Sequence, residues 1–186
     1  MSQRPRLPIL LVCVLVALPA HLVVHECGQI VLARLTGDPD ATLRPSQWHP
    51  SGAMGAWTAE YDATRLTAVG RVLVPLGGLL VTQSVALGIL LVSARRSQRS
   101  RAYAAAAAGS FAIDVALQLG RAIAVSAAHG PYSTGVDLED AAQAIFGLTG
   151  VSIVAVKVAL AVCALAYGLA MWRVIRRRLR GRSWAA

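Results

Sequence analysis

The stretch LPILLVCVLVALPAHLVVHECGQIVLARL, residues 7–35, decides the fold class of this 186-residue chain. An apolar run of about 18 residues or more is long enough, at ~1.5 Å per helical residue, to cross a hydrocarbon core of roughly 30 Å. Three further apolar segments follow, at residues 72–94, 103–128 and 148–172. We therefore predict an all-α fold, an integral membrane bundle of about four transmembrane helices that forms a single domain.

Positive charge alternates with these apolar segments. The net charge is +9, and arginines gather before the first segment, between the second and third, and after the fourth. Because cytoplasmic loops carry the excess of Lys and Arg, we expect cytoplasmic termini and an outer loop at residues 36–71. The basic tail, residues 173–186, suits a cytoplasmic anchor near anionic lipid better than a nucleic-acid site. We expect a multi-pass protein of an inner or plasma membrane, with the lipid bilayer as partner and no nucleic acid.

Side chains that commonly bind metals occur inside the first apolar segment, at HLVVHECGQI, residues 21–30. His25 and Gln29 are four residues apart, one helical turn, so both point the same way, as in the zinc motif H-E-x-x-H. Glu26 holds the position of the general base that activates metal-bound water. His21, one turn before His25, offers a second pair of this kind. The spacing therefore predicts a metal site with His25 and either Gln29 or His21.

The same polar residues also have a structural interpretation, as hydrogen-bonding groups between neighbouring helices. Ionisable groups within a membrane are costly and usually functional, which favours a site. Gln29 stands where the motif has its last histidine, and a glutamine carbonyl is a poorer zinc ligand than imidazole. Both interpretations stay open on the sequence alone.

The stretch VVHECGQIVLARLTG, residues 23–37, resembles the zinc-binding helix of the site-2 protease family of intramembrane metalloproteases. Gly28 occupies the place of the glycine that commonly precedes the second histidine of that family. LVPLGGLLVTQSVALGILL, residues 73–91, looks like the second core helix of the family. The sequence departs from the family at Gln29 and also lacks its usual Asp-Gly pair. The resemblance implies a zinc cofactor and Glu26 as the catalytic base.

In the family the third zinc ligand is an aspartate from a later segment. Its nearest counterpart here is Asp137 in GVDLEDAAQAI, residues 135–145, where it opens a short helix. Asp140 and Asp114 are the other candidates. Asp137 also suits the N-cap of that helix. Asp114 lies at a depth that matches Lys157, which predicts an ion pair holding the third and fourth segments together.

Two functions are compatible with these patterns. An intact site predicts a minimal intramembrane zinc metalloprotease, a metalloendopeptidase that hydrolyses peptide bonds of a transmembrane peptide or protein in or near the membrane. Its catalytic base would be Glu26, and its metal ligands would be His25, Asp137 and either Gln29 or His21. A lost site predicts a catalytically inactive relative that acts as a membrane scaffold or binds a membrane partner.

Overall fold

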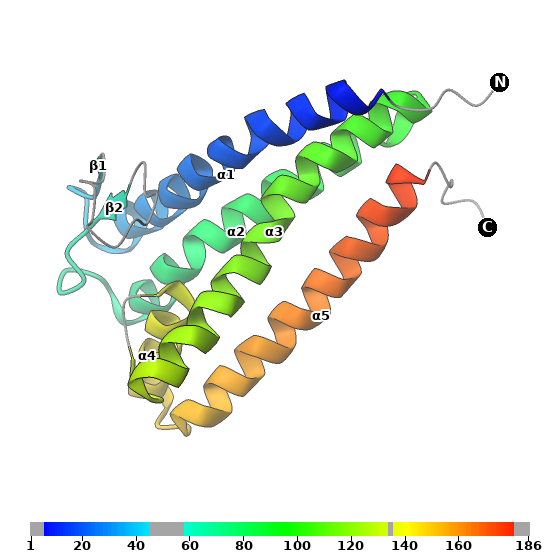
Figure 1. Ribbon diagram of the computed structural model, residues 1–186. Coiled ribbons are helices and arrows are strands. Elements are labelled where there is room, and N and C mark those ends of the chain that lie inside the picture. Colours follow the sequence, from blue (N-terminus) through cyan, green and yellow to red (C-terminus); the bar gives the residue numbers. More distant parts are fainter. Residues whose placement is uncertain (1–5, 45–57, 134–135, 181–186) are drawn as a thin grey trace.

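The computed structural model describes residues 6–44, 58–133 and 136–180, and within them the chain is almost entirely helical (Figure 1). Four helices of these described residues are long and apolar enough to cross a membrane. They are α1 (Leu7–Thr36), α2 (Ala68–Val92), α3 (Gln98–His129) and α5 (Ile153–Leu179). The prediction of an all-α bundle with four long apolar helices is therefore confirmed, and the fold is consistent with a multi-pass membrane protein.

The ends of the helices depart from the predicted segments, most clearly for the last one. A short amphipathic helix, α4 (Asp137–Thr149), ends at Gly150, whose φ of +67° places it in the left-handed region that favours glycine. Helix α5 therefore begins at Ile153 and extends to Leu179, so it includes most of the arginines of the predicted basic tail. The rest of the predicted tail, 181–186, and part of the predicted outer loop, 45–57, lie outside the described residues.

The two ends of the helix bundle are made by different elements. Helices α1, α2 and α3 pack against one another, whereas α5 lies along α3 and touches α4. Helix α1 begins and α5 ends at the same end of the bundle, where the short 3₁₀ helix η1 (Ser93–Arg95) also joins α2 to α3 (Figure 1). Helix α4 and a small hairpin lie at the opposite end.

The hairpin consists of β1 (Thr42–Arg44) and β2 (Thr58–Glu60), paired antiparallel beside the end of α1. An ion pair between Arg44 and Glu60 links the strands. Below them lies a small apolar cluster from α1, α2 and the adjoining loops, made by Ile30, Ala33, Ala41, Leu66 and Val74. Apolar packing therefore holds the hairpin against the bundle.

Glycines set the distance between α1 and α2. A Cβ atom built on Gly28 would lie 2.5 Å from the Gly77 carbonyl oxygen, and one on Gly77 would lie 2.8 Å from the Gly28 oxygen. Neither distance is tolerable for a real Cβ, so the two backbones touch directly, as small residues permit in membrane helices. The next glycine, Gly78, faces the ring of His25, which occupies the space that a side chain would need.

The close approach predicts that Gly28→Val destabilises the fold by about 2–3 kcal/mol or more, because the added methyl groups meet backbone rather than a movable side chain. Gly88→Val is the matched control, since no atom lies within 4 Å of a Cβ built on Gly88. Thermal unfolding in detergent, followed by circular dichroism, compares the two. Equal stability of the variants would contradict direct backbone packing at Gly28.

Candidate functional site

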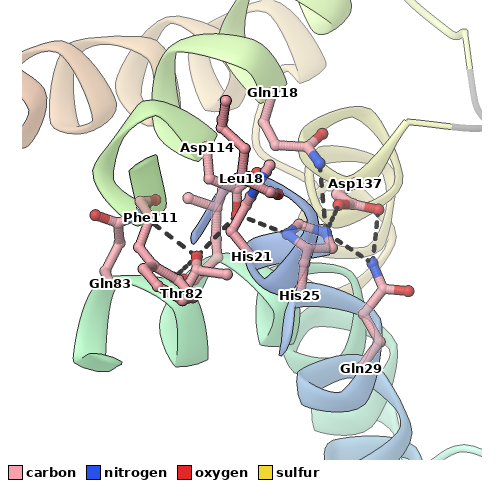
Figure 2. Close-up of polar contacts among 11 residues, drawn as sticks. Leu18, His21, His25, Gln29, Thr82, Gln83, Phe111, Asp114, Gln118 and Asp137 are labelled. Atoms are coloured by element: carbon pink, nitrogen blue, oxygen red, sulfur yellow. Dashed lines mark hydrogen bonds and ion pairs between the residues drawn. The ribbon is translucent and has the colours of Figure 1, made fainter. Parts of the chain in front are cut away.

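His25 is the centre of a polar cluster inside the apolar bundle (Figure 2). Its Nε2 atom lies 2.6 Å from Oδ2 of Asp137, and its Nδ1 atom lies 2.6 Å from Oδ2 of Asp114. Asp114 belongs to α3 and Asp137 to the first turn of α4. A single imidazole thus links three helices, and both of its nitrogens face carboxylate oxygens.

Gln29 lies on the side of the cluster that holds Asp137. Its Nε2 atom donates a hydrogen bond to Oδ1 of Asp137 at 2.9 Å and lies 3.4 Å from Nε2 of His25. The spacing of one helical turn places the Gln29 and His25 side chains on the same face of α1, as the sequence pattern requires. Asp137 therefore meets both His25 and Gln29, the two side chains at the ligand positions of the motif.

Asp114 holds the other side of the imidazole. Its Oδ2 atom accepts a hydrogen bond from the Thr82 hydroxyl at 2.8 Å, and both residues are buried. A carboxylate on one ring nitrogen fixes the tautomer and orientation of a histidine, and leaves the other nitrogen to act as a ligand or acceptor. Gln118, one turn after Asp114, places its amide nitrogen 3.3 Å from Nε2 of His25. Sequence reasoning did not single out Thr82 or Gln118.

The predicted ion pair between Asp114 and Lys157 is wrong. Lys157 of α5 pairs with Glu139 of α4, and it donates a hydrogen bond to the Ser126 hydroxyl at 2.9 Å. Glu139 is buried and also accepts hydrogen bonds from the hydroxyls of Ser126 and Ser133. Helix α4 supplies the carboxylate that α3 was expected to supply, because it packs against α5 as well as against α2 and α3.

Asp137 does not act as an N-cap, and that prediction is also wrong. Val136 occupies the N-cap position, and Asp137 is the first residue of α4. Its carboxylate points to His25 and Gln29, which both lie within 3 Å of it. The strong hydrogen bonds of these partners outweigh a bond to a helix backbone amide. Asp140, the second candidate ligand, lines a separate pocket of about 550 Å³.

Glu26 and Tyr61 lie where the hairpin meets α1. Oε2 of Glu26 accepts a hydrogen bond from the backbone N–H of Ala59 in β2, at 2.7 Å. Tyr61 follows β2, and its pKa is raised to about 12 by burial and by the nearby negative charges of Asp140, Asp137 and Glu26. The phenol therefore keeps its proton and is available as a hydrogen-bond donor. Tyrosines are common where membrane proteins meet the interface, so Tyr61 does not stand out in the sequence.

His21 is buried, but it bonds to its own helix. Its Nδ1 atom lies 2.5 Å from the Leu18 carbonyl oxygen, one turn earlier (Figure 2). Among the hydrogen bonds of the described residues, none joins His21 to Asp114 or Asp137. Of the two candidate pairs, the geometry therefore brings together His25 and Gln29.

Two of the side chains that converge near Nε2 of His25 are of the types that usually bind metals, namely His25 itself and Asp137. Within residues 6–44, 58–133 and 136–180, no group of three or more His, Cys, Asp or Glu side chains is suited to a metal ion. The third donor near His25 and Asp137 is the amide of Gln29, whose oxygen and nitrogen exchange places by rotation of the terminal torsion. One imidazole nitrogen with two oxygens can hold a divalent cation, and it is a harder set than two histidines.

No protein-family model, curated protein or solved structure matches this chain. The resemblance to site-2 proteases therefore stays a prediction that rests on the two stretches that suggested it. The chemistry of the polar cluster around His25 is therefore the basis for a functional proposal.

The network around Lys157 predicts a large cost for losing its charge. Lys157→Met leaves the buried carboxylate of Glu139 without a counterion, and removing one partner of a buried pair typically costs 3–5 kcal/mol. The double variant Lys157→Met, Glu139→Gln restores a neutral network that Ser126 and Ser133 still satisfy. Thermal unfolding in detergent should show the double variant to be the more stable of the two. A double variant as unstable as the single one would refute the pairing.

Proposed function

We propose that this protein is a membrane-embedded, metal-dependent peptidase of the site-2 protease type. The observation that carries the proposal is the convergence of His25, Gln29 and Asp137 from two helices, with Glu26 on the neighbouring position of α1. An ordinary contact between helices needs only one hydrogen bond. Here His25 and Gln29, spaced as in the zinc motif, both meet the carboxylate of Asp137 from a distant segment. The substrate class is a transmembrane peptide or protein.

The residues of the cluster fit a single divalent cation, with zinc as the ion that the resemblance implies. His25 Nε2, the Asp137 carboxylate and the Gln29 amide oxygen would hold it. The bond from Nδ1 of His25 to Asp114 is the arrangement usual for a metal-binding histidine, since it orients the ring and raises its basicity. Thr82 in turn holds Asp114 in place.

A bound cation of this kind polarises a peptide carbonyl and makes water a stronger nucleophile at neutral pH. Glu26 is the group that takes the proton from the attacking water and passes it to the leaving amine. The Ala59 amide holds the Glu26 carboxylate on the hairpin side of α1. Tyr61 carries a protonated phenol close to the same carboxylates, so it can donate a hydrogen bond to the oxygen of the scissile carbonyl.

A second candidate function has an observation of its own. Both nitrogens of His25 have carboxylate partners, and Gln29 donates to Asp137, so these four side chains are hydrogen-bonded to one another without an ion. Such a network joins α1, α3 and α4 by itself. A catalytically inactive relative that serves as a membrane scaffold, or that binds a membrane partner, would keep this arrangement.

We infer an orientation with both termini in the cytoplasm of a cell with an inner or plasma membrane. Most of the arginines in the described residues belong to the start of α1, the junction of η1 with α3 and the last turns of α5, which share one end of the bundle, as the positive-inside rule requires for a cytoplasmic end. The polar cluster and the hairpin then lie toward the outer surface. A substrate would meet the site from the outer half of the membrane.

Metal content separates the two candidate functions. We expect the purified full-length protein, loaded with zinc and dialysed, to retain about one ion per chain by elemental analysis, and His25→Ala to lose it. His21→Ala is the matched control and should retain the ion. Gln29→His should bind zinc about tenfold more tightly or better, because imidazole replaces an amide oxygen. Absence of zinc from both the wild type and Gln29→His would exclude the peptidase and leave the scaffold.

The proposed base is tested by Glu26→Gln, which keeps the shape of the side chain and removes the proton acceptor. In the zinc-loaded protein we expect cleavage of synthetic single-span peptides in micelles, followed by mass spectrometry, to slow by about 10²-fold or more. Glu60→Gln, an exposed change in β2, should cleave like the wild type. Undiminished cleavage by Glu26→Gln would rule out this role for Glu26.

A further inference from the structure

One face of α5 changes from apolar to charged at the basic end of the bundle. Gly168, Met171, Ile175 and Arg178 follow one another at intervals of three, four and three residues along the helix, so they form a single stripe. Met171 and Ile175 are buried in the apolar cluster that α5 shares with α3. Arg178 continues the same buried face about one turn further on.

Arg178 is buried, and no carboxylate of the described residues forms an ion pair with it. Its residue is only 8% exposed, and its Nε and Nη1 atoms have no hydrogen-bond partner among the described residues. Arg101, in the first turn of α3, is close enough to act on Arg178 electrostatically, and it is also positive. A buried guanidinium with unsatisfied donors is costly unless it is paired. The two arginines therefore form a site that an anion would complete.

An open groove begins beside Arg178 and runs along the α3–α5 contact. It has a volume of about 510 Å³ and is lined almost wholly by apolar side chains, Ile175 and Trp172 among them. Gly109, Gly120 and Gly168 also line it, and a Cβ atom built on any of the three would have no atom within 4 Å. These glycines leave space beside the helices that no residue of the described bundle fills.

The dimensions of the groove match one lipid chain. From Ile175 to Ala164 the groove follows α5 for ~16 Å at 1.5 Å per residue, and half of a hydrocarbon core of roughly 30 Å is ~15 Å. A helix of that length and ~10 Å diameter would fill more than ~1,200 Å³, over twice the groove volume. The occupant that suits both the apolar groove and the unpaired arginines is an amphiphile with a negative head.

We propose that the α3–α5 groove binds one anionic phospholipid, with its phosphate between Arg178 and Arg101 and one acyl chain along Gly168 and Gly120. Guanidinium groups bind phosphate oxygens through charge-assisted hydrogen bonds, which would satisfy the Nε and Nη1 donors. The lipid belongs to the leaflet that meets the basic end of the bundle. The phosphate site is separate from the proposed peptidase site, because the start of α3 and the end of α5 lie at the other end of the bundle from α4 and the hairpin.

Native mass spectrometry of the full-length protein in detergent tests the proposal, with three probes: phosphatidylglycerol, phosphatidylcholine of the same chains, and inorganic phosphate. We expect one phosphatidylglycerol to be retained about tenfold more tightly than phosphatidylcholine, and Arg178→Gln to remove that preference. Arg177→Gln is the matched control, since it removes the same charge from an exposed position on the same turn.

The groove is tested separately from the head site. Gly168→Leu places a side chain in the open space and should lower phosphatidylglycerol binding about tenfold, whereas Gly88→Leu, on α2 and outside the groove, should not.

Equal retention of the two lipids, or equal effects of Arg178→Gln and Arg177→Gln, would overturn the head site. Unchanged binding in Gly168→Leu would overturn the chain site. Displacement of the lipid by inorganic phosphate at similar concentration would show a simple anion site instead. Circular dichroism confirms that each variant is folded.

Discussion

An imidazole held between two carboxylates, in an interior that is largely apolar, is the interaction on which this bundle depends. His25 can be buried only if Asp114 and Asp137 reach it, because an ionisable group left without a partner in a medium of low polarity is costly. That requirement fixes α1, α3 and α4 relative to one another. The direct backbone contact of Gly28 with Gly77 gives α2 its place against α1.

Helix α4 is the element that connects this interaction to the rest of the fold. Its first residue, Asp137, meets His25, and two residues later Glu139 pairs with Lys157 of α5. These two ionic contacts point to different neighbours, so α4 is held from two sides. The peptidase and the scaffold share this geometry. They differ in whether a cation or a shared proton lies between Nε2 of His25 and the carboxylate of Asp137.

Helix α3 has two faces with different chemistry. One face carries Asp114 and Gln118, which complete the polar cluster. The other carries small residues, with Gly109 and Gly120 along the open groove against α5. The groove lies along the contact between α3 and α5, the neighbour against which α5 packs over most of its length. One helix thus serves a polar site on one face and an apolar groove on the other.

The sequence by itself determined the four apolar helices, the common direction of His25 and Gln29, and the short helix that Asp137 opens, because hydropathy and helical spacing are local properties of a chain. Tertiary structure alone decided that Asp137 bonds to His25 rather than capping its own helix, and that Lys157 pairs with Glu139 rather than Asp114. It also decided that Tyr61 lies among carboxylates. Such choices depend on how far each helix is rotated and shifted along its axis, and side-chain packing between distant segments sets both.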